Sequence, residues 1–286
     1  MNETVGEERR IGVRRVSTDG GEAWQLVPDA SLRYVFLSPH LDDAVLSCGN
    51  LLLALGDGAD VTVCTLFTEQ SAPHTASARA YLRQCGADSA AQLYARRRAE
   101  DGDVLARVGA TLLHAGLDDA LFRKRSGAAA ARLASLLPEL GHVYPTYRWH
   151  VAAGRVRRPD RHVVRAVTEL VERLVAQGPT VLVAPLGVGG HVDHVLVRDV
   201  AARTGGDVLY YADLPYALQQ GPDATFTAAH RLTPVTVPAT GPGKNPLIAG
   251  YRTQVDALFP GGVPLLEDRL HVPASLLTVV GGGGAA

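Results

Sequence analysis

Residues 34–43, which read YVFLSPHLDD, decide how this chain is expected to fold. The first four are apolar, with the β-branched and aromatic side chains that are typical of a buried strand. Pro39 to Asp43 would then lie at the C-terminal end of that strand. Residues 181–184, VLVA, repeat the pattern and lead through a glycine-rich loop to GHVDH at 190–194. Because ligands bind outside the carboxyl ends of the strands in an open parallel α/β sheet, we expect the two loops to meet.

Strand-like and helix-like apolar patterns alternate along the rest of the chain. We expect strands at 60–67, 110–113, 180–185 and 207–212, and helices at 43–55, 90–108, 128–136, 163–176, 192–203 and 244–259. This alternation predicts an α/β protein: a single Rossmann-like domain with a mostly parallel sheet and helices on both faces. Residues 68–80 and 143–160 lack periodicity, so we expect two long loops that contact a substrate.

The domain boundaries follow from the two ends of the chain. Residues 11–16 and 23–27 flank TDGG at 18–21, a turn sequence that is typical of a β-hairpin. We therefore expect residues 1–30 to be a polar leader and an edge hairpin, and residues 31–280 to be the main domain. Residues 281–286 are expected to be a disordered tail.

The composition excludes several classes of protein. With a formal net charge of −1 and a pI near 6.8, the chain has no excess of positive charge for binding nucleic acid. It shows no apolar leader and no apolar run long enough to span a membrane, so we expect a cytoplasmic protein. Three cysteines do not make a disulfide or metal framework, and Cys48 and Cys64 are expected to be buried free thiols. A homo-oligomer is compatible with this composition.

The two strand-end motifs carry the residue types of a metal site. Two imidazoles and one carboxylate would hold a divalent ion and leave a position open for water, as in catalytic zinc sites. The alternative for HLDD, residues 40–43, is a helix N-terminus without metal, where aspartates cap amides and complement the helix dipole.

The motifs resemble those of the PIG-L/LmbE-like family of metal-dependent (zinc) de-N-acetylases. That family reads Pro/Ala-His-Pro-Asp-Asp-Glu after its first strand and His-Pro-Asp-His after a later one. Here Leu41 replaces the proline and Ala44 replaces the glutamate, and neither position supplies a ligand. Some members carry a tyrosine where this chain has Gly189. Further similarity lies at Arg97, Glu100, residues 117–120, Lys244, Tyr251 and Gln254.

The resemblance assigns the metal to His40, Asp43 and His194. Histidine and carboxylate ligands suit Zn²⁺ and are compatible with Fe²⁺ or Co²⁺. Asp42, which precedes one of these ligands, is expected to be the general base that takes a proton from water and gives it to the departing amine. Its alternative role is the helix cap.

Residue spacing and the resemblance together indicate roles for the residues around the metal. His191 is expected to donate a hydrogen bond to the developing oxyanion, although a core histidine bonded to backbone is the alternative. Asp193 resembles a carboxylate that orients a histidine ring. Arg97 and Asp119 match positions on the substrate side of the pocket, but charges at such spacing are also common on a solvated helix face.

These residues predict a hydrolase that removes an N-acetyl group from an amino sugar or a related secondary-metabolite intermediate, a small molecule. A second hypothesis is a non-haem Fe(II) oxygenase, which uses two histidines and one carboxylate but builds them on a β-sandwich. A third is a sugar-binding module without catalysis. The substrate itself, and any residue that replaces the tyrosine at Gly189, cannot be read from the sequence.

Overall fold

The computed structural model describes residues 11–18 and 21–280. In it, residues 34–38 belong to the central strand of the parallel part of the sheet, and residues 39–42 form the loop that follows this strand. Strand β3 (Arg33–Ser38) lies between β4 (Asp60–Thr65) and β6 (Thr180–Pro185), and all three run parallel. Outside them, β5 (Thr111–His114) and β7 (Asp207–Tyr211) complete the parallel order β7-β6-β3-β4-β5. The chain builds outward from β3 in one direction and from β6 in the other, so a ligand-binding switch point lies between these two strands.

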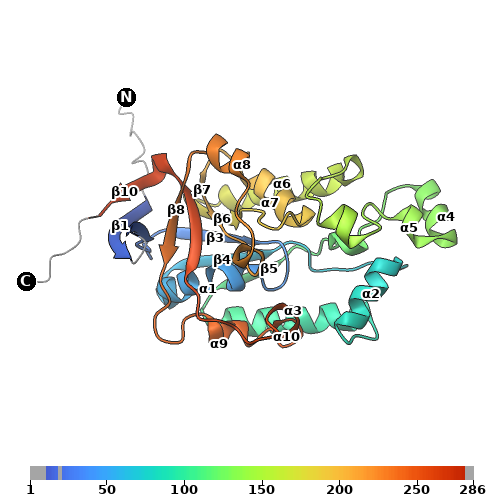
Figure 1. Cartoon of the computed structure of the whole chain (residues 1–286). Coiled ribbons are helices and arrows are strands. Elements are labelled where there is room, and N and C mark those ends of the chain that lie inside the picture. The colour runs from blue at the N-terminus through green and yellow to red at the C-terminus, as the bar shows by residue number, and fades with distance from the viewer. Residues whose placement is uncertain (1–10, 19–20, 281–286) are drawn as a thin grey trace, which may run out of the picture.

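Helices cover both faces of the parallel strands. Helices α1 (Asp43–Leu55) and α3 (Ala90–Ala106) lie on one face, and α6 (Arg161–Val175) and α7 (Val192–Ala201) lie on the other (Figure 1). Successive residues of β3 enter different cores: Phe36 packs with the first layer and Val35 with the second. Burial on both faces explains the continuous apolar run, and the expected α/β class is confirmed.

The other half of the sheet is mixed and was only partly expected. The full order is β10-β1-β2-β8-β9-β7-β6-β3-β4-β5, and β9 (Asp268–Pro273) runs antiparallel to both β7 and β8 (Leu232–Val237). Strands β1 (Ile11–Thr18) and β2 (Gly21–Leu26) form the expected antiparallel hairpin. The hairpin is not the edge of the sheet, however, because β10 (Leu277–Val279) pairs outside β1.

The prediction of a single helix over residues 244–259 is wrong. Two short helices, α9 (Asn245–Ile248) and α10 (Val255–Leu258), replace it. Tertiary contacts override the local periodicity: the Lys244 ammonium is buried 2.8 Å from Asp268, and the Tyr251 hydroxyl donates to Asp101 at 2.8 Å. The intervening Gly250 approaches α3 so closely that a Cβ atom there would lie 2.3 Å from a methyl of Val104.

The two expected loops contain short helices. Helix α2 (Ala76–Gln84) begins inside the first, where the Thr75 hydroxyl accepts a hydrogen bond from the amide of Ala78. The second contains a π-helical turn, Tyr147–Val151, and a 3₁₀ turn, Arg158–Asp160. The remaining helices are α4 (Ala128–Leu136), α5 (Pro138–Gly141), α8 (Ala224–Ala229) and 3₁₀ turns at Gly56–Gly58, Ala120–Phe122, Tyr216–Leu218 and Ala274–Leu276.

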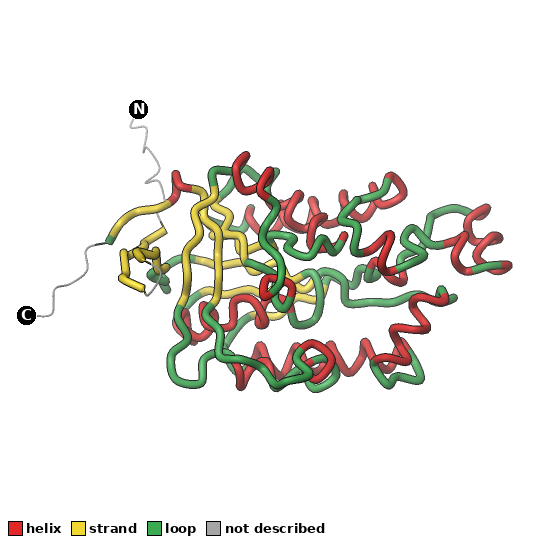
Figure 2. The backbone as a smooth tube through the Cα atoms, in the orientation of Figure 1, coloured by secondary structure: helices red, strands yellow, loops and turns green. Residues whose placement is uncertain are grey.

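Helices α2, α4 and α5 form a lobe beyond the carboxyl ends of the parallel strands. Figure 2 shows the strands gathered at one end of the molecule and only helices and loops at the other. Cys48 and Cys64 are buried free thiols, as expected. Within residues 11–18 and 21–280, no helix has the length and apolar character needed to cross a bilayer. The expected polar leader up to residue 10 and the tail at 281–286 lie outside the described residues.

Candidate metal and catalytic site

Local hydrogen bonds fix the turn that leads from β3 into α1. The Ser38 hydroxyl donates to the backbone carbonyl of His40 at 2.6 Å and accepts from the amide of Ala44 at 3.1 Å. The amide of His40 donates to Asp43 Oδ2 at 2.8 Å. The turn therefore holds the His40 ring and the Asp43 carboxylate on the same side, at the switch point of the sheet.

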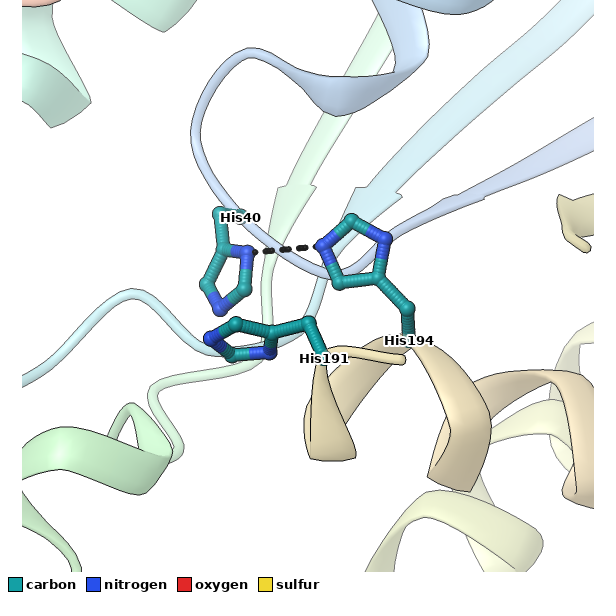
Figure 3. A group of neighbouring side chains, drawn as sticks. All are labelled: His40, His191 and His194. Carbon is teal, nitrogen blue, oxygen red and sulfur yellow. Dashed lines mark hydrogen bonds between the residues drawn. The ribbon is translucent and has the colours of Figure 1, made fainter. Parts of the chain in front are cut away.

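Three ligand-type atoms from the two motifs form a nearly equilateral triangle. His40 Nδ1 lies 3.1 Å from Asp43 Oδ2 and 3.2 Å from His194 Nε2, and the last two atoms are 3.3 Å apart. A tetrahedral ion with bonds of about 2.0–2.1 Å would separate its ligands by about 3.3 Å. Figure 3 shows His40 and His194 facing each other from the β3 loop and helix α7. The triangle thus has the dimensions of three corners of a zinc site.

Carboxylates outside the triangle fix the tautomers of both rings. His194 Nδ1 lies 2.7 Å from Asp213 Oδ1, and His40 Nε2 lies 3.3 Å from Asp193 Oδ2. A carboxylate accepts the N–H of the neighbouring ring, so the proton of each neutral imidazole belongs on its outer nitrogen. The inner nitrogens of the two rings then turn toward one another, so their lone pairs can bind a shared proton or a metal ion.

The charges around the triangle also favour a cation. Burial lowers the pKa of His40, but hydrogen bonds to Asp193 and Asp43 raise this pKa well above its usual value. Burial also lowers the pKa of His194, but the charge of Asp43 and the hydrogen bond to Asp213 raise this pKa to about 10. Burial raises the pKa of Asp43, yet the charge and hydrogen bond of His194 hold it well below the usual range.

His191 completes the histidine group but has a different environment. One ring nitrogen each of His40, His191 and His194 lies within 4.8 Å of the others (Figure 3). Burial and the charge of His40 lower the pKa of His191 well below its usual value, so the ring is neutral. His191 is the N-cap of α7, and its Nδ1 accepts from the amide of Asp193 at 3.3 Å. Its proton therefore resides on Nε2, which can donate a hydrogen bond.

Asp42 is a buried carboxylate with a perturbed pKa. It is the N-cap residue of α1, but its side chain makes no capping hydrogen bond, which removes the evidence for a cap role. Burial, reinforced by the charge of Asp43, raises the pKa of Asp42 to about 7, while Arg97 opposes this shift. A carboxylate with a pKa near neutrality suits a group that accepts and returns a proton.

Asp193 lies behind His40 rather than in the open cavity. It is fully buried, accepts from the amide of Ala120 at 2.9 Å, and pairs with Arg123 at 2.5 Å. The Arg123 guanidinium also contacts Asp160 at 2.7 Å. Although His40, Asp119 and Asp193 also lie close together, these bonds already satisfy Asp193, so its oxygen contacting His40 Nε2 orients the ring.

The expected site residues other than Asp193 line one cavity of about 450 Å³. Arg97 is buried there, with its guanidinium donating to the Tyr81 hydroxyl at 2.6 Å. Asp119 accepts from the Tyr94 hydroxyl at 2.8 Å and lies 3.7 Å from His40 Nε2. Neither lies on a solvated helix face. The similar position Glu100 does not line this cavity.

Two contributors were missed by the sequence reasoning. Asp213 follows β7 as the metal-type motifs follow β3 and β6, so its place after a strand was the available signal. No such signal marks Tyr216 in the sequence. In the structure its ring fills the space beside Gly189, where a Cβ atom would lie 2.5 Å from Tyr216 Cγ. The ring packs edge-on against His194, and its hydroxyl lies 3.3 Å from that of Tyr147.

Known proteins are similar to this chain in sequence and in fold. Residues 35–204 match the family model described as PIG-L: GlcNAc-PI de-N-acetylase. The 2′-N-acetylparomamine deacetylase of Streptomyces fradiae is 33% identical over 214 residues, covering 70% of this chain and 67% of that protein.

Solved structures agree with this match. The A40926 pseudoaglycone deacetylase Dbv21 is similar with a TM-score of 0.63 and 25% identity, covering 85% of this chain and 97% of that one. A deacetylase from the biosynthesis pathway of teicoplanin gives a TM-score of 0.62 and 27% identity, covering 80% and 87%.

Proposed function

Because this chain belongs to the PIG-L family of GlcNAc-PI de-N-acetylases, we propose that it hydrolyses the N-acetyl group of an amino sugar in a secondary-metabolite intermediate. The products are the free amine and acetate. The observation that carries this proposal is the triangle of His40, Asp43 and His194 beside the buried Asp42 carboxylate.

We assign the metal to His40, Asp43 and His194, and Zn²⁺ suits this donor set best, with Fe²⁺ and Co²⁺ as alternatives. The fit rests on ligand separations of 3.1–3.3 Å and on two rings whose protons are held outward by Asp193 and Asp213. When bound, such an ion polarises the amide carbonyl and lowers the pKa of water.

The protein groups divide the proton transfers between them. The Asp42 carboxylate accepts a proton from the attacking water and returns it to the amine nitrogen as the carbon–nitrogen bond breaks. The neutral His191 ring donates from Nε2 to the carbonyl oxygen as negative charge develops there. Arg97 and Asp119, on the cavity wall, contact the sugar.

The rival hypotheses lack structural support. Non-haem iron oxygenases that use two histidines and a carboxylate build them on a β-sandwich, whereas the ligands here follow parallel strands of an α/β sheet. A binding module without catalysis would not need the Asp42 carboxylate, with its pKa of about 7, beside the triangle of His40, Asp43 and His194.

The decisive experiment measures acetate release from a panel of N-acetylated amino sugars and acylated metabolites, with Zn²⁺, Fe²⁺ or Co²⁺ supplied. We expect the parent enzyme to release acetate, and Asp42→Asn to lower turnover by about 10²- to 10⁴-fold while retaining the metal, because an amide cannot accept the proton. No acetate from any substrate with any of these ions would contradict the function. An Asp42→Asn variant as active as the parent would contradict the base assignment.

A further inference from the structure

Helix α1 bends at Cys48, a few residues after the turn that forms part of the candidate site. Cys48 has φ −128° and ψ 17°, which is not helical, so two helical segments join here at a kink. The segment before the kink carries Asp43 and Leu46, which line the cavity of the candidate site. The segment after it places three leucines in the hydrophobic core: Leu51, Leu52 and Leu55. The kink therefore sets the direction of the short segment that carries a proposed metal ligand.

A carboxylate from strand β9 accounts for this kink. In an unbroken helix the amide of Leu51 would donate to the carbonyl of Ser47, four residues earlier. Here it donates to Asp268 Oδ2 at 2.8 Å. A side chain that enters the ladder of helical hydrogen bonds is a common cause of a kink. A carboxylate is also favoured at this place, because the second segment begins there and its first amides carry positive partial charge.

A buried lysine holds the carboxylate in place. Lys244 Nζ lies 2.8 Å from Asp268 Oδ1, and the two residues are 0% and 1% exposed. The Asn50 carboxamide donates to the same oxygen at 3.1 Å and accepts from the amide of Lys244 at 3.0 Å. Gly49 makes room for the lysine, since a Cβ atom there would lie 2.5 Å from Lys244 Cβ. The ion pair is thus packed directly against the kinked part of α1.

The segment before the kink contacts both sides of the candidate site. It begins at Asp43, which the proposed function assigns as a metal ligand. Near its other end, Ser47 Oγ accepts from the amide of Leu214 at 3.1 Å. Leu214 follows Asp213, the carboxylate that lies 2.7 Å from His194 Nδ1. A change in the direction of residues 43–47 would therefore displace one ligand and the carboxylate that orients another.

We propose that Lys244 and Asp268 are positioning residues, which hold the kink in α1 that places Asp43 and Asp213 for metal binding. Stability alone does not account for the pair, because replacing a buried ion pair by apolar side chains of similar size is often neutral or stabilising. What apolar side chains cannot supply is the acceptor oxygen for the Leu51 amide. This inference rests on the proposed function for its assignment of the metal ligands.

Two double variants separate the acceptor oxygen from the charges. Lys244→Met/Asp268→Asn removes both charges but keeps an oxygen that can accept from the Leu51 amide. Lys244→Met/Asp268→Leu removes both charges and the acceptor, in nearly the same shape. Val235→Ala, which opens a cavity in the core at strand β8, is the control for a general loss of stability. The readouts are the Kd for Zn²⁺ against a competing chelator and the Tm of the metal-free protein.

We expect the leucine double variant to bind Zn²⁺ about tenfold more weakly than the parent, the scale seen when the surroundings of a ligand are lost. In this variant the Leu51 amide regains a partner only if α1 straightens, which moves residues 43–47. The asparagine double variant should bind Zn²⁺ as the parent does. Val235→Ala should lower the Tm without changing the Kd, so that a loss of stability is distinguished from a loss of positioning.

Equal zinc affinities in the two double variants would overturn the inference, because the acceptor oxygen would then have no effect on the site. If the leucine double variant does not fold, Ser47→Ala decides, since it removes only the bond to the Leu214 amide. Weaker zinc binding by Ser47→Ala would support the inference, and parent-like binding would overturn it. Absence of acetate release by the parent would overturn the proposed function, whereas the comparison of zinc affinities would still test the positioning role.

Discussion

Asp213→Asn tests whether the arrangement around the metal-type triangle depends on a carboxylate outside it. Asp213 uses its two oxygens for two buried donors: Oδ1 lies 2.7 Å from His194 Nδ1, and Oδ2 accepts from the amide of Val188 at 2.7 Å. Asparagine has the same shape but only one acceptor oxygen, and its NH₂ group must face one of these donors. The substitution therefore forces a choice between the two.

Both choices have a cost that can be estimated. If the NH₂ group faces Val188, a buried amide loses its partner, which costs about 1–3 kcal/mol of stability. If the NH₂ group faces His194, Nδ1 of this ring must accept a hydrogen bond, so the ring proton moves to Nε2. The lone pair of Nε2, which would bind the metal, is then lost. Loss of such a carboxylate partner typically weakens metal binding about 10- to 100-fold, or about 1.4–2.7 kcal/mol.

The assay is a Zn²⁺ titration against a competing chelator, with thermal unfolding of the same metal-free samples recorded alongside. We expect a weaker apparent Kd for zinc, a lower Tm, or both, in Asp213→Asn. Asp199→Asn, on helix α7 but paired with Arg198, is the control and should leave both quantities unchanged. Parent-like zinc affinity together with a parent-like Tm in Asp213→Asn would refute the reasoning.

Three further predictions concern other parts of the chain. His191→Ala should lower kcat about 10²- to 10³-fold with normal metal content by mass spectrometry, and metal loss would instead make His191 a ligand. Arg123→Met should lower the free energy of unfolding in urea by about 3–5 kcal/mol, because Asp160 and Asp193 stay buried without their cation; a loss below about 1 kcal/mol would contradict this. Burial lowers the pKa of His271 from 6.5, so the unfolded chain binds a proton on this ring at a higher pH than the folded chain does. The ring therefore costs no stability above about pH 6.5, and the free energy of unfolding decreases as the pH falls below that value. His271→Val should therefore lose less stability than the parent between about pH 7 and 5, and equal losses would contradict the assignment.

The central part of the fold was predictable because its signals are local. The bounds expected for the helix at Asp43–Leu55 and the strand at Thr180–Pro185 are those observed. Strands buried on both faces need continuous apolar runs, and helices that cover them need apolar periodicity, so each segment carries its own evidence. The half-buried, mixed strands β8, β9 and β10 lack such runs and were missed.

The sequence named most of the side chains that line the candidate cavity, but not Asp213 or Tyr216 and not the geometry. The motifs at 40–43 and 190–194 named the side chains, and the resemblance to de-N-acetylases gave them roles. Neither could show that Asp213 holds the His194 ring, since carboxylates after strands are common and only the packing of β7 beside β6 directs this one. The space beside Gly189 likewise reveals its occupant, Tyr216, only in three dimensions.

The sequence by itself thus determined the α/β class, the order of the parallel strands and the residues proposed as ligands, because apolar periodicity and short motifs are properties of neighbouring residues. The tertiary structure alone decided the distances between them. His40 and His194 meet because β3 and β6 are paired, with Phe36 beside Val183, and this pairing places the ends of two distant segments side by side. Which nitrogens face inward then depends on Asp193 and Asp213, whose carboxylates accept the outer protons.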